Sequence, residues 1–276
     1  MKKNSILTVI FAYAVMITAA VLTLAPIALS VNTALRDPND FLRQGPMHLP
    51  DPLTLDNFIT LFTREDSFLT PFAVTTQMVL VILIGQIIFS VLAAYAFAFF
   101  TFRGRDALFW VFVSTLMVPQ VVVVVPLFLA FSGTGLRNTF FALVLPYVLG
   151  SPYAVFLLRE NFRSMSQELL DAMRVDGAGH LRLLWNLVLP LNRPIIITLV
   201  VITVVTHWNS FLWPLVITSG PTWQTITVAT SGLSTQYSSN WTLVMAATTL
   251  ALIPLVLLYF VFQKHVARSI SGTELR

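Results

Sequence analysis

Charged side chains are spaced unusually far apart along this chain. Only 10 % of its 276 residues are Asp, Glu, Lys or Arg, against about a quarter in an ordinary soluble domain. The longest gaps between charges cover residues 4–35, 67–102, 107–136, 138–158 and 194–263. Because a transmembrane helix needs about 20 consecutive apolar residues, each of the first four gaps holds one span and the last holds two. The chain is therefore expected to be an integral membrane protein.

The predicted fold class is an all-α membrane protein with six transmembrane helices, in a single transmembrane domain over residues 1–276. The spans are expected at residues 6–30, 71–101, 107–130, 139–158, 194–218 and 241–262. Pro119 and Pro126 are expected to break the third span, and Gly85 thins the second. The first segment is longer than a usual signal-peptide core, so it is interpreted as a retained span.

The distribution of Lys and Arg fixes the predicted topology. An even number of spans puts both termini on one side, and twelve of the sixteen cations then lie on that side. The positive-inside rule places this side in the cytoplasm. External loops are therefore expected at residues 32–70 and 219–240, and a cytoplasmic loop at 159–193.

Two of these loops have content of their own. The loop at 32–70 carries six acidic residues and four prolines, which favours a small ordered excursion with a helix near residues 55–62 over a solvated tether. The cytoplasmic loop alternates charged and apolar residues at helical spacing. Ser164 and Gln167 suggest a capping box, Gly177 can close the helix, and Asp176 can cap a second helix over residues 178–188.

The first cytoplasmic helix is interpreted as a docking knob for a partner. Its acids, Glu168, Asp171 and Asp176, would face an anionic leaflet if it lay on the lipid surface, and its apolar stripe of Leu169, Ala172 and Met173 is narrow. An interfacial helix on the headgroups is the alternative.

A family resemblance begins in this loop. The run Asp171-Ala172-Met173-Arg174-Val175-Asp176-Gly177-Ala178, followed by Leu189-Pro190 and Arg193-Pro194, resembles the EAA loop of permease subunits in binding-protein-dependent ABC importers. It departs from that pattern at Asp171, Met173 and Ser166. Further landmarks resemble the carbohydrate branch and its maltose-type second permease: Met117-Val118-Pro119, Val125-Pro126-Leu127, Gly135-Leu136-Arg137-Asn138-Thr139, Leu157-Leu158-Arg159 and Trp208-Asn209-Ser210-Phe211-Leu212-Trp213-Pro214-Leu215.

The resemblance implies a transport subunit of the cell inner membrane, and no enzyme. Its partners would be a homologous permease, two cytoplasmic ATPase subunits, an extracytoplasmic solute-binding protein or lipoprotein, and the lipid bilayer, with no nucleic acid. The chain has no Gly-x-x-x-x-Gly-Lys-Ser/Thr motif, so no cofactor is expected in it, and ATP and Mg would bind to the ATPase subunits. The solute would be a sugar or a sugar-derived compound, such as a disaccharide, an amino sugar, a sugar alcohol or a glycerol-phosphate compound.

Three groups of site residues are predicted, with no catalytic group. The ATPase-coupling group is Glu168, Leu169, Asp171, Ala172, Met173, Asp176, Gly177 and Ala178. The translocation path is assigned to Thr206, Asn209, Ser210 and Trp213, which recur at helical spacing on one face, with interhelical hydrogen bonding as the alternative. Contact with the binding protein is assigned to Thr222, Trp223, Gln224, Gln236 and Tyr237, with a plain surface loop as the alternative.

Other function classes fit less well. A secondary active transporter of small polar solutes is the main alternative, but the predicted spans contain no Asp or Glu for ion coupling, and no inverted repeat is visible. The chain has no cysteine, and its four histidines are scattered, so neither a metal site nor an intramembrane enzyme is expected.

Overall fold

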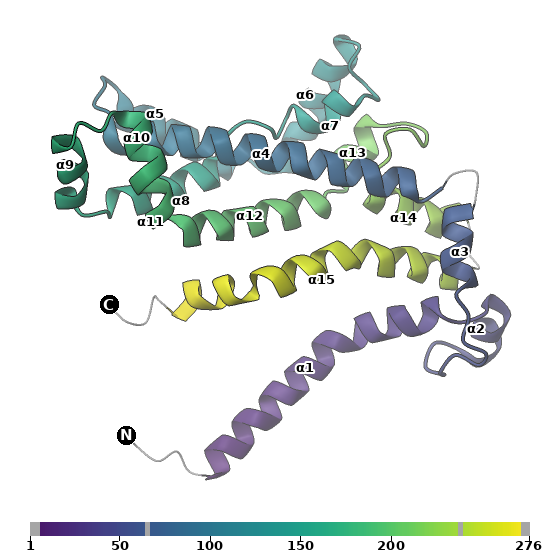
Figure 1. Ribbon diagram of the computed structural model, residues 1–276. Coiled ribbons are helices and arrows are strands. Elements are labelled where there is room, and N and C mark those ends of the chain that lie inside the picture. Colours follow the sequence, from purple (N-terminus) through teal and green to yellow (C-terminus); the bar gives the residue numbers. More distant parts are fainter. Residues whose placement is uncertain (1–5, 64–66, 237–239, 272–276) are drawn as a thin grey trace. The chain divides into compact units, whose positions relative to one another are not determined.

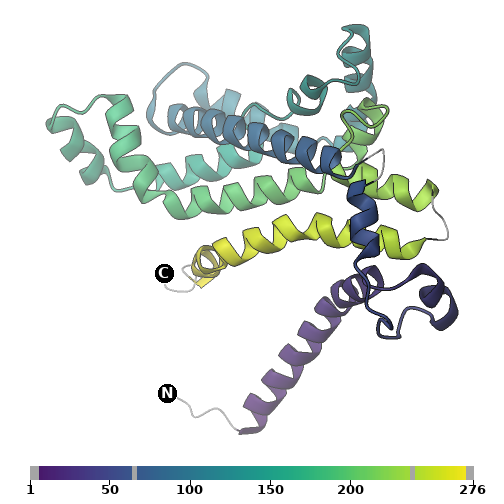
Figure 2. The ribbon, with the colours of Figure 1, turned by 45° about the vertical axis from the view of Figure 1, so that its right-hand side comes forward.

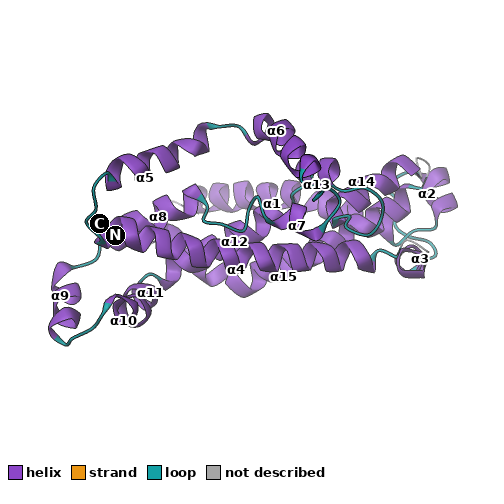
Figure 3. Ribbon diagram, turned by 90° about the horizontal axis from the view of Figure 1, so that it is seen from above, coloured by secondary structure: helices purple, strands orange, loops and turns teal. Residues whose placement is uncertain are grey.

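The computed structural model describes residues 6–63, 67–236 and 240–271, with the backbone alone described for 235–236 and 265–271. This part of the chain contains helices and no strand (Figure 3). The elements, in chain order, are α1 (Ile6–Ala34), α2 (Pro38–Gln44), α3 (Asp56–Thr63), α4 (Leu69–Phe99), α5 (Arg105–Ser114), η1 (Thr115–Met117), α6 (Gln120–Gly133), α7 (Phe140–Val144), α8 (Pro152–Arg163), α9 (Gln167–Val175), α10 (His180–Leu183), η2 (Leu184–Val188), α11 (Leu189–Leu191), α12 (Arg193–Trp208), α13 (Leu212–Ile217), α14 (Ile226–Gln236) and α15 (Trp241–Ser271).

Among the described residues, three helices are long and apolar enough to cross a membrane: α1, α4 and α15 up to Lys264. Two bent pairs bring the number to five if each is one span. One pair joins Arg105–Met117 to Gln120–Gly133 at 98°, and the other joins His180–Leu191 to Arg193–Trp208 at 79°. The predicted break at Pro119 is confirmed, whereas Pro126 lies inside α6 without ending it.

The expectation of one helix over residues 139–158 is wrong. Helix α7 ends at Val144, and α8 begins only at Pro152. Pro146, Gly150 and Pro152 are poor residues for a helix interior, because proline lacks the N–H group and glycine costs backbone entropy. The intervening segment packs on α4 instead: a Cβ on Gly85 would lie 2.4 Å from the Val148 carbonyl oxygen, so only glycine allows this close approach.

The chain divides into two compact units. The first comprises the segment up to Leu69 together with Ala229–Pro254, and the second comprises Thr70–Val228 and the segment from Leu255 onward. In the second unit, α4, α8 and α12 run alongside one another (Figures 1 and 2). Its core gathers apolar side chains of α4, α5, α8, α9, α10, η2 and α12, including Phe109, Leu158, Phe162 and Leu199.

In the first unit, the segment after α1 is folded around a buried arginine. Arg36 pairs with Asp40 at 2.7 Å and donates to the Gly45 carbonyl oxygen, and its guanidinium lies over the Phe41 ring. Asn57 donates to the carbonyl oxygens of Ala34 and Arg36, both at 2.8 Å. Helix α3 confirms the predicted helix near residues 55–62, so residues 32–63 form an ordered excursion and not a tether.

Candidate functional site

Helix α9 lies beyond the end of α4, at the end of the second unit where α5, α10 and α11 also lie (Figures 1 and 2). Of its nine side chains, all of which the structure describes, only that of Leu170 is buried, and it is 1 % exposed. Leu170 packs in the core with Phe162 and Leu183. Met173, partly buried, packs against the same core, so these two side chains hold the helix and its exposed residues are available to a partner.

Most of the predicted coupling residues are on the free surface of this helix. Glu168, Leu169, Asp171 and Ala172 are exposed, and Met173 is partly buried. Arg174 pairs with Asp171 at 3.0 Å within the helix. Sequence reasoning missed Val175, which is 88 % exposed at the end of α9, although a β-branched residue between two charges was a visible signal.

The turn after α9 matches the predicted role of Gly177. Its φ is +73°, a left-handed conformation that glycine adopts without a side-chain clash. The Gly177 N–H donates to the Arg174 carbonyl oxygen, and the Ala178 N–H donates to that of Met173, both at 3.0 Å. These bonds satisfy carbonyl groups at the end of the helix, so the turn is held by local geometry.

Two predicted caps are wrong. Ser164 follows α8 and donates to the Asn161 carbonyl oxygen, so it forms no capping box with Gln167, and Ser166 is the residue that precedes α9. Asp176 follows α9 as its C-terminal cap, whereas Gly179 precedes α10. The backbone reverses at Gly177 and starts the second helix three residues later, which takes Asp176 out of capping position.

Helix α10 (His180–Leu183) contacts the end of α4. The Nδ1 atom of His180 lies 3.1 Å from the Tyr95 hydroxyl, and the imidazole also packs edge-on against the Phe100 ring. The chain then continues through the π-helical η2 and α11 into α12. Helix α10, which follows α9, is therefore joined to α4 by the His180–Tyr95 contact and to α12 by short helical segments.

The stem of the loop, α8, is fixed by a buried arginine. Arg159 lies 3.1 Å from an Asp106 carboxylate oxygen and 2.8 Å from Glu160, and its guanidinium stacks 3.9 Å above the Phe109 ring. Asp106 and Phe109 belong to α5, so the pair joins α5 to α8. The landmark Arg159 thus has a structural role that its sequence context did not reveal.

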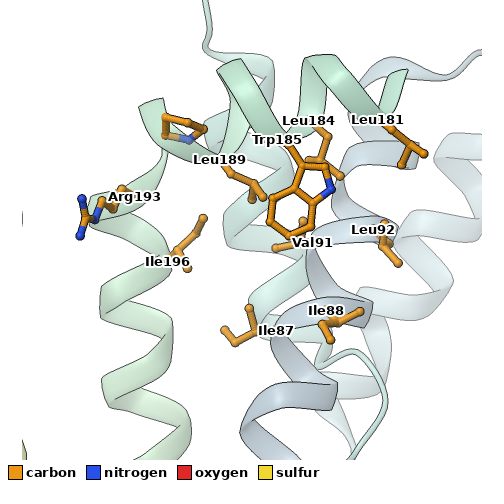
Figure 4. Close-up of a pocket in the computed structure, with 11 residues that line it drawn as sticks. Ile87, Ile88, Val91, Leu92, Leu181, Leu184, Trp185, Leu189, Arg193 and Ile196 are labelled. Atoms are coloured by element: carbon orange, nitrogen blue, oxygen red, sulfur yellow. The ribbon is translucent and has the colours of Figure 1, made fainter. Parts of the chain in front are cut away.

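An apolar groove opens between α4 and the connection from α10 to α12 (Figure 4). Its lining residues are Ile87, Ile88, Val91, Leu92, Leu181, Leu184, Trp185, Leu189, Pro190, Arg193 and Ile196. Figure 4 shows the Trp185 ring over Val91, and the Arg193 guanidinium pointing away from the groove. This lining offers few hydrogen-bonding groups to a hydroxylated solute.

The structure does not bring the four predicted path residues onto one helical face. Helix α12 ends at Trp208, and α13 begins at Leu212, so helical spacing does not extend from Thr206 to Trp213. Thr206 and Asn209 are exposed, and the Asn209 amide donates to the Val205 carbonyl oxygen. Trp213 is 1 % exposed, and its indole donates to the Ala142 carbonyl oxygen at 2.9 Å.

A polar chain that the sequence did not predict crosses the second unit. Thr203 donates to the Gln86 amide oxygen at 3.4 Å, and the Gln86 amide nitrogen lies 3.2 Å from Nε2 of His207. The Tyr147 ring packs on His207 at 5.1 Å between centroids, and Gln120 donates to the Tyr147 hydroxyl at 2.9 Å. Gln86 was the available signal, because it is an amide in the middle of an uncharged span.

The predicted external segment is partly helical, since α14 occupies Ile226–Gln236. Thr222 is exposed before it, whereas Trp223 and Gln224 are partly buried, and Trp223 packs on the Phe140 ring at 5.7 Å. The side chain of Gln236 and the whole of Tyr237 lie outside the described residues.

Comparison with known proteins gives consistent matches. The family model described as "Binding-protein-dependent transport system inner membrane component" matches residues 86–272. The arabinooligosaccharides transport system permease protein AraQ of Halalkalibacterium halodurans is 32 % identical over 262 residues, which cover 94 % of this chain and 92 % of AraQ. The sn-glycerol-3-phosphate transport system permease protein UgpE of Yersinia pestis is 34 % identical over 277 residues, covering 96 % of each chain.

Two solved structures share the fold. A chain of a bacterial ABC transporter that imports the acidic polysaccharide alginate is 24 % identical, with a TM-score of 0.81 over 96 % of this chain and 99 % of that chain. A chain from the bacterial alginate ABC transporter in complex with an alginate pentasaccharide-bound periplasmic protein is 18 % identical, with a TM-score of 0.66 over 94 % of each chain.

Proposed function

Since the chain belongs to the family of inner-membrane components of binding-protein-dependent transport systems, we propose that it helps to form the membrane pathway of an ATP-driven sugar importer. It would pair with a homologous permease and receive a sugar or sugar-derived solute from an external binding protein, soluble or lipid-anchored. ATP and Mg would be bound by two separate cytoplasmic ATPase subunits. The observation that carries this proposal is the family match, which includes the whole of helix α9 (Gln167–Val175), the predicted docking helix and hereafter the α9 knob.

The membrane topology is proposed from charge and helix length together. Six spans with both termini in the cytoplasm would place α9 and α10 beside the ATPase subunits. The three long helices and the two bent pairs account for five of these spans. The segment from α7 to α8 would supply the sixth. The twelve cations on the proposed cytoplasmic side support this orientation.

Coupling would pass through the surface of α9. Glu168, Leu169, Asp171 and Ala172 are exposed and available to a partner, and the turn with Asp176, Gly177 and Ala178 would hold the helix at a fixed angle. Met173 is partly buried, so only the exposed part of its side chain would contact the ATPase subunit. The buried Leu170, the Arg159–Asp106 pair and the Tyr95–His180 contact would carry ATPase movement into α4, α5 and α8.

The remaining predicted sites stand as parts of this proposal. Thr206, Asn209 and Ser210 would offer hydrogen bonds to a solute in transit, with Trp213 as buried support behind them. On the external side, Thr222, Trp223, Gln224, Gln236 and Tyr237 would meet the binding protein.

The experiment uses the complete importer reconstituted in liposomes. Replacing ATP with a non-hydrolysable analogue should abolish solute uptake while the binding protein still docks. Uptake that continues under an ion gradient without ATP hydrolysis would contradict the proposal.

A further inference from the structure

The polar chain from Gln86 to Gln120 is buried at one end and open at the other. Thr203, His207 and Gln86 are buried, Tyr147 is partly buried, and Gln120 is exposed. Buried polar groups are stable when they are hydrogen-bonded to one another, and the three inner residues meet that condition. The inner residues therefore support Tyr147, while the outer pair meets whatever lies outside the chain.

The open end of the chain of contacts lies at a broken helix. Gln120 is the first residue of α6, directly after the 98° bend at Pro119, and Met117 before the bend is 83 % exposed. Irregular backbone at membrane depth occurs where it is covered by protein or lines a water-filled cavity, and not against lipid. Within this chain, no other segment covers the described residues at the bend. The bend must therefore face either the partner permease or a water-filled cavity, and the proposal below takes the cavity.

The outer pair has the chemistry of a hydroxyl-binding site. The Gln120 amide donates one N–H to Tyr147, which leaves its carbonyl oxygen as an acceptor and the Tyr147 O–H as a donor. A sugar hydroxyl both donates and accepts. The phenol ring adds an apolar face, held in place by the His207 imidazole behind it.

The charge of this site also restricts the solute. Gln86, Gln120, Tyr147 and Thr203 carry no charge at neutral pH, and the remaining member of the cluster is the His207 imidazole. Residues 107–136, 138–158 and 194–263 contain no Lys or Arg, and Arg137, between two of these ranges, lies over the Phe128 ring at 5.4 Å. A phosphate or carboxylate taken out of water needs a cation or several directed donors to offset its desolvation. The outer pair offers no cation and two directed donors, the Tyr147 O–H and the second Gln120 N–H, which is fewer than the three terminal oxygens of a phosphate group require.

We propose that Gln120 and Tyr147, backed by His207 and Gln86, form a second solute-contacting site of this chain beside the α12–α13 junction, and that the solute is a neutral carbohydrate. The inference rests on the proposed import function and narrows it. Among the named relatives, one is a permease for arabinooligosaccharides and another for sn-glycerol 3-phosphate, so the two chemistries are distinct outcomes.

The first test measures access to the site in the complete importer. The chain has no cysteine, so Gln120→Cys introduces a single thiol. A small membrane-impermeant thiol reagent added from the binding-protein side should modify it in the nucleotide-trapped state, whereas Val124→Cys, buried on the same helix, should stay unmodified. A Gln120→Cys thiol that is unreactive in every nucleotide state would show that the bend is covered by the partner permease, and would overturn the proposal.

The second test measures transport with Tyr147→Phe, which removes the hydroxyl and keeps the ring. Uptake of the solute recovered from the binding protein should show a KM raised about three- to tenfold, as expected for one lost hydrogen bond. Tyr153→Phe is the matched control, because Tyr153 is an exposed tyrosine on α8 outside the cluster. An equal KM in both variants would overturn the site.

The third test identifies the solute by mass spectrometry of the ligand released from the denatured binding protein. A neutral sugar supports the proposal, whereas a phosphorylated or uronic-acid ligand overturns it. Failure here is distinct from failure of the import function, because a charged solute could still be taken up with ATP hydrolysis.

If the binding protein carries no ligand, arabinotriose and glycerol 3-phosphate are compared as uptake probes in the reconstituted importer. Uptake of arabinotriose alone supports the proposal, and any other result counts against it.

Discussion

The α9 knob and the junction between α12 and α13 are both rich in polar residues, yet they are held in place in different ways. Helix α9 depends on the buried Leu170, on Met173 packed against the same core, and on a glycine turn whose hydrogen bonds join residues at most five apart. The junction depends on distant partners: Trp213 donates to Ala142, and Thr227 donates to the Ser210 carbonyl oxygen.

This difference explains why one surface is readable from its residues and the other is not. A motif fixed by local geometry keeps its side chains free, so residue type and spacing describe its surface. At membrane depth, a polar side chain must first satisfy backbone and neighbouring groups, and only the remainder is available to a solute. Substitutions in the two regions should therefore have different consequences.

The largest effect is expected at the glycine turn. Gly177→Pro forces φ to about −65° where the chain has +73°, and it removes the N–H that donates to Arg174. The chain should still insert in the membrane but lose the ATPase subunits, and uptake should fall more than tenfold. Co-purification with the ATPase and ATP-driven uptake measure both effects.

Gly179→Ala is the control for the turn. Gly179 has a negative φ, and a Cβ built on it meets nothing within 4 Å. Its uptake should match the unmodified protein. Normal uptake by the Gly177→Pro variant would show that α9 does not couple the ATPase to transport.

The next effect tests the packing of Leu170, the buried side chain of α9. Leu170→Ala removes a side chain buried against Phe162 and Leu183, which costs about 3 kcal/mol of stability for a core leucine. Because this anchor lies between α9 and the core, hydrogen exchange should rise in α9 before it rises in α4. Leu181→Ala, at an exposed leucine of α10, should leave exchange in α9 unchanged. Equal exchange of α9 in both variants would show that Leu170 does not hold this helix.

Much of the architecture was predictable because it follows from local patterns. Charge gaps located α1, α4 and α15, and Pro119 marked the bend before α6. The segment from Leu145 to Ser151 was not predictable as a loop from hydropathy, because it is apolar and packs on α4 through Gly85.

The sites divide in the same way. Exposure along α9 followed from alternating residue types, but the polar chain joins residues up to 121 positions apart, as between Gln86 and His207. Such pairing depends on how α4 and α12 pack, which no local spacing encodes. The early end of α12 is accompanied by a local bond instead, since the Asn209 amide donates to the Val205 carbonyl oxygen at the point where the helix stops.

A smaller effect distinguishes packing from passage at the α12–α13 junction. Trp213→Phe leaves the Ala142 carbonyl oxygen without the indole donor in a buried place, so the free energy of unfolding should fall by about 1–3 kcal/mol. Asn209→Ala loses only a local bond and should lower uptake a few-fold with assembly unchanged. Thermal unfolding measures the stability, ATP-driven uptake measures transport, and co-purification with the partner permease measures assembly. If Asn209→Ala instead disrupts that pairing, Asn209 belongs to helix packing.

The smallest effect is expected from cysteine substitutions that serve only as crosslinking sites, because they change no interaction of the buried core. In this chain without cysteine, Gln224→Cys and Val175→Cys each introduce one thiol, at opposite ends of the proposed topology. In the ATP-bound importer, a short bifunctional reagent should join Gln224→Cys to the binding protein and Val175→Cys, at a highly exposed position of α9, to an ATPase subunit. Because each variant is the other's control, exchanged crosslinks would reverse the proposed orientation. Crosslinks from Val175→Cys with none from Gln224→Cys would keep the knob and remove the segment before α14 from the binding-protein contact.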